Sequence, residues 1–401
     1  MLSTDSIDKL MKPIVDRQEQ LNTYVLKKIA SRIKEIGQLT PSDTKTLEQM
    51  VRNGADVREI NLELAKLSNL QVRDIKALIK EVAIQDYADV RAFYDYRRLS
   101  YIPFEENEHL QQIVNAMAQQ TAQSYVNLTK TQAFMLKDDY TKQLKPTTIN
   151  ETYYQTVDKA VQAVTTGTVD YRTAMRETMN QLIDSGIRTV DYASGYHRRL
   201  DSVVRMNILD GVRQLNIQMQ DELGKQFGSD GKEITVVMNP APDHAPVQGH
   251  QFTNDNFDKM QNDLPFEDID GKEYDAMERA IGVWNCRHIA YSIIIGVMKQ
   301  NYTNEQLQKI LDNNEAGYTT KDGKHFTMYE CRQYQRKTEA NIRRLKDGQI
   351  AYKAAGDMEM ATKFQRKIDR LTQQYMLFSN NCGLRPELGR IYVQGYKQIK
   401  I

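Results

Sequence analysis

Apolar residues recur every three or four positions over most of this 401-residue chain, and this spacing restricts its fold more than any other feature. Such a spacing places apolar side chains on one face of an α-helix, whereas a half-buried strand would need strict alternation. A first stripe runs through residues 1–36, and Gly37 is expected to end that helix. The clearest stripe lies in residues 196–224 and comprises Leu200, Val204, Ile208, Val212, Leu215 and Met219. The sequence therefore predicts a mainly α fold built from long helices.

Capping and breaking residues divide the rest of the helical sequence. Thr40 is expected to begin a second helix, which Asn53 and Gly54 would end. Residues 68–71 resemble a capping box and predict the start of another helix that runs toward residue 96. Further helices are expected in residues 106–136, 149–164 and 168–184.

A small α+β core is expected near residues 233–300. Residues 233–238 carry β-branched side chains after a glycine-bearing turn, and they form the one convincing strand of the sequence. The prolines at 240 and 242 keep the following loop extended, because each proline fixes its own φ and restricts its predecessor. A second strand or a short helix is expected near Phe252.

The last part of the chain predicts a helical hairpin, with arms at 327–355 and 357–379 and a turn at Gly356. The second arm carries an apolar seam of Met360, Phe364, Ile368, Leu371, Tyr375 and Phe378. The arms are also rich in lysine and arginine, which usually form a solvated surface. Contact of this basic hairpin with nucleic acid stays open as the alternative.

These patterns divide the chain into four expected parts. They are a helical N-terminal region (1–102), a helical region (103–227), a small α+β core with a histidine and cysteine loop (228–325), and a helical hairpin with its tail (326–401).

Composition excludes several classes of protein. The balance of 54 basic against 53 acidic residues gives no overall attraction to nucleic acid or to a membrane surface. Three scattered cysteines are too few for a disulfide framework, and no apolar run approaches the length of a membrane span. The N-terminus lacks the basic and then apolar order of a signal peptide. We expect synthesis in a reducing cytoplasm.

Histidine and cysteine gather in two short segments, at 238–252 and 284–288. His244, His250, Cys286 and His288 offer three imidazoles and one thiol, which is an adequate ligand set for zinc. Their spacing is unlike that of zinc fingers, and two residues spaced like Cys286 and His288 would chelate one ion more readily from a loop than from a strand. We therefore expect no metal and no other cofactor, with zinc at these four residues as the alternative. In the favoured interpretation, His244 and His288 donate hydrogen bonds to backbone carbonyls.

Catalysis by the same segments is the second alternative. Cys286 would be a nucleophile if His244 or His288 activated it, and Arg287 would lower its pKa if the thiol were exposed. No oxyanion hole, glycine-rich phosphate loop or H-E-x-x-H motif accompanies these residues. We therefore expect no catalytic residue, and we expect Trp284 to be a core anchor.

The two histidine and cysteine segments contain a set of motif residues that we expect to form one structural core: Pro242, Asp243, His244, Gln248, Gly249, Phe252, Trp284, Asn285, Cys286, Arg287 and His288. Further motifs flank them at residues 127–130, 327–336, 378–379 and 395–397. In this fixed order, the motifs resemble the phage minor capsid protein 2 family, which is itself similar to the Mu F-like head morphogenesis proteins.

The resemblance implies a structural protein of the virion of a tailed bacteriophage or prophage, made in the bacterial host cytoplasm. It implies a minor head protein near the portal that acts in head morphogenesis or in DNA packaging and delivery. The implied partners are the portal protein, the major capsid protein and other virion proteins, with double-stranded DNA as a further candidate. Two alternatives stay open. One is a metal-dependent enzyme or toxin-like domain that uses the histidine and cysteine loop, and the other is a DNA-binding virion protein that uses the basic hairpin.

Overall fold

A computed structural model of the chain describes residues 4–38, 47–89, 91, 94–95, 100–138, 141–166, 170–191 and 193–400. The chain forms two compact units, each assembled from three segments. The first unit comprises Met1–Lys12, Val72–Tyr125 and Arg205–Gln333. The second unit comprises Pro13–Gln71, Val126–Val204 and Tyr334–Ile401. The helix start expected at Thr40 lies outside the described residues.

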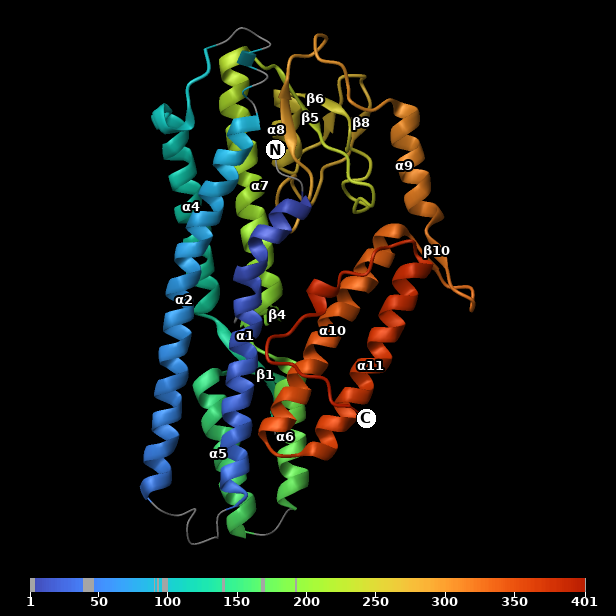
Figure 1. The fold of residues 1–401 in the computed structure, drawn as a ribbon. Helices are drawn as coiled ribbons and strands as arrows, with labels where there is room; N and C mark the ends of the chain where they lie inside the picture. Colours follow the sequence, from blue (N-terminus) through green and yellow to red (C-terminus); the bar gives the residue numbers. More distant parts are fainter. Residues whose placement is uncertain are drawn as a thin grey trace. The chain divides into compact units, whose positions relative to one another are not determined.

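Helices dominate the described chain, as the apolar stripes predict (Figure 1). The α-helices are α1 (Thr4–Ile36), α2 (Leu47–Asp89), α4 (Glu108–Thr129), α5 (Ile149–Thr166), α6 (Tyr171–Ser185), α7 (Leu200–Phe227), α8 (Asn254–Gln261), α9 (Asn304–Ala316), α10 (Met328–Ala354) and α11 (Met358–Asn381). Two short 3-10 helices are η2 (Phe104–Glu106) and η3 (Leu388–Ile391). None of the helices in this described part combines the length and the apolar character that a membrane span requires.

The strands are short and pair only in antiparallel fashion among the described residues. They are β1 (Gln132–Lys137), β2 (Leu144–Thr148), β3 (Arg188–Val190), β4 (His197–Arg199), β5 (Gly231–Ile234), β6 (Gln251–Thr253), β7 (Phe266–Glu267), β8 (Glu273–Tyr274), β9 (Ala290–Ile293), β10 (Tyr318–Thr319) and β11 (His325–Phe326). The sheets have the orders β2-β1-β3-β4, β6-β5-β9, β7-β8 and β10-β11. The prediction of a mainly α fold with a small α+β core near residues 233–300 is confirmed.

The side chains of the predicted apolar stripes are buried in the core of the protein. All six stripe residues of α7, from Leu200 to Met219, are buried. Helix α1 ends at Ile36, directly before Gly37, and α6 ends at Ser185, before Gly186 with a φ of +59°. Stripe periodicity and C-terminal glycine therefore located these helices correctly, because both report directly on backbone geometry.

The predicted break at Asn53 and Gly54 is wrong, and so is the helix start at residues 68–71. Helix α2 runs without interruption from Leu47 to Asp89. A single glycine costs a helix interior only about 1 kcal/mol relative to alanine, which a helix of 43 residues tolerates. Gln71 caps no helix: its side chain is buried and its Nε2 donates to the backbone oxygen of Ile14 at 2.8 Å.

The prediction of one helix over residues 106–136 is also wrong at its C-terminal end. Helix α4 ends at Thr129, and the chain enters β1, which pairs with β2 and β3. Pro146 lies in β2, an edge strand, where a missing N–H leaves no ladder bond unmade. The stretch 132–136 is apolar enough for a helix or a strand, so its pairing partners decide the outcome.

In the first unit, the small sheet of β5, β6 and β9 packs on α7. Ser292 of β9 donates from its hydroxyl to the backbone oxygen of Gln220, and Lys232 of β5 donates to Ser292 at 2.7 Å. Gly224 makes this approach possible, since a Cβ there would lie 2.7 Å from the Ser292 hydroxyl. The strand expected at 233–238 lies instead at Gly231–Ile234. The prediction that it is the one convincing strand of the sequence is wrong, because the described residues also form other short strands.

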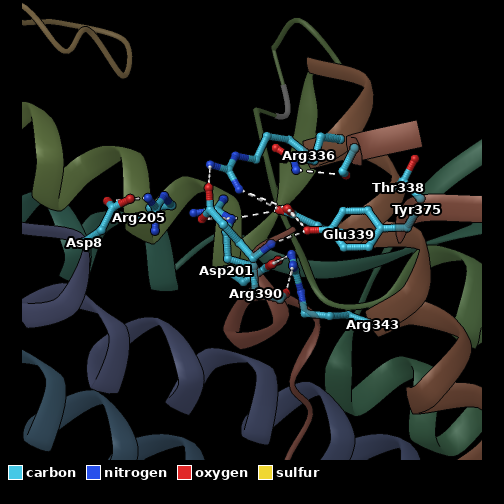
Figure 2. Close-up of polar contacts among 12 residues, drawn as sticks. Asp8, Asp201, Arg205, Arg336, Thr338, Glu339, Arg343, Tyr375 and Arg390 are labelled. Carbon is cyan, nitrogen blue, oxygen red and sulfur yellow. Dashed lines mark hydrogen bonds and ion pairs between the residues drawn. The ribbon is translucent and has the colours of Figure 1, made fainter. Parts of the chain in front are cut away.

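In the second unit, α10 and α11 form the predicted hairpin, with Gly356 between them at a φ of +75°. The C-terminal tail returns along this hairpin: Gln335 donates to the backbone oxygen of Arg385, and Gln349 donates to that of Lys397. Figure 2 shows Arg336, Arg390 and Tyr375 directed at the carboxylate of the buried Glu339. The Glu339 oxygens accept from Arg336 at 3.0 Å, from Arg390 at 2.8 Å and from Tyr375 at 2.9 Å. The Glu339 carboxylate on α10 is thereby connected to α11 and to the C-terminal tail.

A second buried group of charges also lies in this unit. Arg343 donates to Glu19 at 2.6 Å and to Asp201 at 3.0 Å, and Arg199 lies 3.5 Å from Glu19. Asp347 accepts from Asn22 at 2.8 Å and from Thr23 at 2.7 Å. Asp347 also lies 3.8 Å from Arg199, so three carboxyl groups share two guanidinium groups. Burial and the charge of Asp201 raise the pKa of Glu19 to about 8, so that one carboxyl of the group keeps its proton at neutral pH.

The Glu339 contacts predict that Glu339→Gln destabilises the second unit. The substitution removes the carboxylate nearest to Arg390 and leaves Arg336 only its ion pair with Glu387, and breaking a buried ion pair in this way costs about 3 kcal/mol. Urea unfolding of the full chain measures the change. The matched control is Glu359→Gln on the same hairpin, since Glu359 is also ion-paired but half exposed, and such a pair contributes less than about 1 kcal/mol. Equal losses in the two variants would contradict the role given to Glu339.

The buried charge group predicts a stability that depends on pH through Glu19. The folded chain holds the Glu19 proton up to a pH of about 8, whereas the unfolded chain releases it near 4.5. The folded state therefore loses stability as pH rises between these two values, by up to about 1.4 kcal/mol per pH unit. Glu19→Gln removes this dependence.

Thermal unfolding from pH 5 to pH 8, an interval of about three units, tests the sign. We expect the melting temperature of the wild type to fall relative to that of Glu19→Gln as pH rises. The control Glu177→Gln replaces an exposed carboxyl and is expected to follow the wild type. Parallel curves for the wild type and Glu19→Gln would refute a raised pKa at Glu19.

Candidate functional site

The first part of the candidate site is a compact loop that follows β5 at residues 241–249. Its end is fixed by Gly249, which donates from its N–H to the backbone oxygen of Ile234 at 2.8 Å. The buried side chain of Gln248 accepts from the N–H of Val237 at 2.8 Å, which ends the strand earlier than the sequence predicts. On the exposed side, Asp243 forms a two-bond pair with Arg279, with both distances 2.8 Å. The loop is therefore held at both ends.

The second part is the turn at residues 282–288, whose backbone is unusual. Trp284 and Asn285 both have positive φ, at +51° and +64°, a conformation that costs non-glycine residues energy. The carboxylate of Asp210 on α7 accepts from the N–H of Trp284 at 3.1 Å and from that of Asn285 at 2.8 Å. These two bonds compensate the strain and fix the turn to the helix.

Trp284 is not the core anchor that the sequence predicts. Its side chain is 63% exposed, because the left-handed turn uses the backbone of this residue to bind Asp210. The buried positions of the turn belong instead to Cys286 and His288. Cys286 joins the apolar core of the small sheet, which also includes Ile234, Phe252 and Ile281.

The two parts meet at three side chains. His244, Cys286 and His288 are 0%, 2% and 3% exposed, and one ligand atom of each lies within 4.8 Å of the others. The Sγ of Cys286 is 3.4 Å from Nδ1 of His244 and 3.5 Å from Nδ1 of His288. The N–H of His288 also points at this sulfur, at 3.4 Å. Cys286 and His288 lie before β9 and outside a strand, which is the arrangement that permits them to face one point.

The far nitrogen of each imidazole has an oxygen partner. Nε2 of His244 lies 2.9 Å from the backbone oxygen of Arg279, which can only accept. Nε2 of His288 lies 3.3 Å from Oε1 of Gln248, whose orientation the Val237 N–H determines. Both Nε2 atoms therefore carry hydrogen, as assigned from their acceptors. The expected bond from histidine to a backbone carbonyl occurs at His244, whereas His288 uses a side-chain amide.

Burial sets the protonation of the group. It lowers the pKa of His244, and it lowers that of His288 to about 3, with a further contribution from the charge of His244. Both imidazoles are therefore neutral near pH 7, so each Nδ1 presents a lone pair to the sulfur.

Cys286 lacks the properties of a nucleophile. Burial raises the pKa of its thiol, which opposes the activation expected from Arg287. A reactive cysteine needs both a lowered pKa and access to substrate, and the sulfur of Cys286 has neither. The expectation of a lowered pKa depended on exposure of this thiol, and the fold buries it.

The remaining candidates lie apart from the three buried side chains. His250 is 3.5 Å from Asp268 and contacts the ring of Tyr274. Asp268 itself accepts from two backbone N–H groups and from the Tyr274 hydroxyl, so that it stabilises the turn between β7 and β8. Of the other motif residues, Phe252 is buried, whereas Pro242, Asp243 and Asn285 are exposed. Gln248 and Gly249 are both buried, and Oε1 of Gln248 lies 3.3 Å from Nε2 of His288.

Sequence reasoning missed Asp210 and Arg279. Asp210 lies on α7 between stripe positions, where an acid usually faces solvent. Arg279 supplies the carbonyl for His244 and the guanidinium for Asp243, although it belongs to neither motif segment. No periodicity or spacing marks either residue, because both act through contacts that only the fold forms.

The fold and the site define a mainly helical protein in which two histidines and one cysteine are buried together in a small α+β core. The sequence model of the phage minor capsid protein 2 family matches residues 2–378. Because the match spans nearly the whole chain, this protein belongs to the phage minor capsid protein 2 family, as its motifs indicate. Neither the curated proteins nor the solved structures include a significant match.

The loop geometry predicts a large cost for Gly249→Ala. Gly249 has a φ of +77°, and an added Cβ would lie 2.4 Å from Cδ2 of the buried Leu307 and 3.0 Å from Val236. The left-handed backbone costs alanine about 1–2 kcal/mol, and the overpacking adds about 1–3 kcal/mol.

Gly271→Ala is the matched control, since Gly271 has a φ of +80° and open space around its Cα. We expect Gly271→Ala to lose only the free energy that the left-handed backbone costs alanine, without the cost of overpacking. Denaturant unfolding of both variants gives the difference, and a control as unstable as Gly249→Ala would show that Leu307 does not confine the loop.

Proposed function

We propose that the protein is a minor structural component of the head of a tailed phage or prophage, positioned near the portal. The single observation that carries the proposal is the family match over residues 2–378, since the family has a structural role in the phage particle. The proposed action is in head morphogenesis or in DNA packaging and delivery. The proposed partners are the portal protein, the major capsid protein and other virion proteins, and the proposed place of synthesis is the bacterial host cytoplasm.

The chemistry of the described chain supports a structural role over a catalytic one. The buried carboxyl groups of Glu339 and Glu19 are bound to other side chains of the chain and serve to hold helices together. The thiol of Cys286 is buried with a raised pKa, which counts against an enzyme or toxin-like activity built on it. The proposal therefore includes no catalytic step.

Contact between DNA and the basic hairpin is the second candidate, and the side-chain contacts weaken it. Arg336, Arg343, Arg344 and Lys363 form ion pairs within the protein, and Lys346 donates to the backbone oxygen of Ile391. These side chains are less available to neutralise phosphates, whereas Lys337, Arg366, Lys367 and Arg370 of the same arms are exposed. Binding of duplex DNA with a steep dependence on salt would favour this candidate.

The proposal predicts that the protein is present in finished particles at low copy number and at one vertex. Mass spectrometry of particles purified on density gradients measures its amount relative to the major capsid protein. Immunogold labelling, or chemical crosslinking to the portal protein, gives its position. The control is a nonstructural phage protein, which should be absent from the same particles.

Absence from particles, with normal expression in the host cell, would overturn the structural assignment. Labelling spread evenly over the head would overturn the position near the portal and leave the structural role standing.

A further inference from the structure

The buried group of His244, Cys286 and His288 has the dimensions of a metal site. A tetrahedral zinc ion bound at about 2.1 Å by nitrogen and about 2.3 Å by sulfur places these two ligand atoms about 3.6 Å apart. The two distances from Sγ of Cys286 to an imidazole Nδ1 are 3.4 Å and 3.5 Å. All three ligand atoms lie within 4.8 Å of one another. An ion would therefore fit with small side-chain movements.

The hydrogen atoms available in this group do not satisfy its lone pairs. Both imidazoles carry their hydrogen on Nε2, toward Arg279 and Gln248, so that both Nδ1 atoms are acceptors. The thiol of Cys286 has one hydrogen and can donate it to only one of the two. The N–H of His288 adds a donor to the sulfur and none to the second Nδ1. A buried acceptor without a donor is costly, whereas a cation in place of the thiol hydrogen binds all three lone pairs.

The surroundings of the imidazoles have the form that metal-binding histidines require. Such histidines almost always donate their second N–H to an oxygen acceptor, which fixes the ring and its tautomer. His244 donates to the Arg279 carbonyl at 2.9 Å and His288 donates to the Gln248 amide at 3.3 Å. The amide is fixed in turn by the N–H of Val237. Two histidines with this arrangement, facing one buried sulfur, point to an ion more specifically than the sequence spacing does.

We propose that His244, Cys286 and His288 bind one zinc ion, with Nδ1 of each histidine and the thiolate of Cys286 as ligands. Two nitrogens and one sulfur suit this borderline cation, whereas calcium and magnesium require oxygen ligands. Three protein ligands leave the fourth tetrahedral position to water or another small ligand. The ion would join the loop at 241–249 to the turn at 282–288.

Zinc content of the full chain, purified without chelator and without a histidine tag, is the first measurement. We expect about one zinc per wild-type chain, and less than about a tenth of that for Cys286→Ser and for His288→Asn. Cys331→Ser and His250→Gln are the matched controls, since Cys331 is also buried and His250 lies in the same loop region. Both controls are expected to retain the metal.

Cobalt substitution of the wild type provides a measurement that does not depend on whether the variants fold. Cobalt(II) bound by the proposed ligands gives a charge-transfer band from thiolate to metal and the intense visible bands of a tetrahedral site. Failure of the wild type to take up zinc on titration would overturn the proposal. So would cobalt binding without a thiolate band, or stoichiometric zinc in folded Cys286→Ser. None of these results bears on presence in the particle, so the two proposals fail separately.

Discussion

Charged side chains buried between long helices must find partners within the chain, and the packing of the second unit depends on this constraint. Helices with one apolar stripe leave polar side chains at the edges of their contacts, where water is excluded. Glu339 meets the constraint with two arginines and a tyrosine, and Arg199 and Arg343 meet it with two aspartates and the protonated Glu19. In each case residues far apart in the sequence are tied to one another. The cost of a wrong pairing is therefore high, which favours one arrangement of the helices over others.

In the first unit, backbone N–H and carbonyl groups likewise find partners within the chain. Asp210 binds the two N–H groups that the strained turn at Trp284 and Asn285 exposes, and Ser292 binds the backbone of α7 where Gly224 lets the sheet approach. Strain in the turn persists because α7 supplies the compensating carboxylate. The position of Cys286 and His288 thus depends on a helix that contains neither of them.

The sequence predicts the helices whose apolar side chains recur with helical periodicity. It does not predict the elements whose conformation depends on tertiary contacts. The stripes of α1 and α7 and the seam of α11 were sufficient to predict these helices, because burial of one face is a local property of spacing. The strand β1 was not predictable, since its apolar run suits a helix equally well until β2 and β3 pair with it. The unbroken α2 shows the opposite error: Gly54 and a capping-box pattern are weak local signals that a long helix overrides. The division into four sequential parts stays a prediction.

The candidate site shows the same limit at the level of single residues. Residue types and the motif order identified His244, Cys286 and His288, and the loop context predicted that two of them would face one point more easily outside a strand. The exclusion of His250 and the roles of Asp210 and Arg279 were not predictable, because each follows from a contact across at least one intervening element.

The buried histidines and cysteine and the buried carboxylates make separate demands on the molecule. The three proposed ligands belong to the first compact unit, whereas Glu19 and Glu339 belong to the second. Loss of the ligands would remove the proposed metal link between the loop at 241–249 and the turn at 282–288, and it would leave the ion pairs of the hairpin intact. Loss of Glu339 would remove one of the contacts that hold the C-terminal tail and would leave the three ligands in place. The proposed zinc ion would therefore hold the small core of the first unit together. The helices of the second unit depend instead on buried ion pairs, and their stability changes with pH through Glu19.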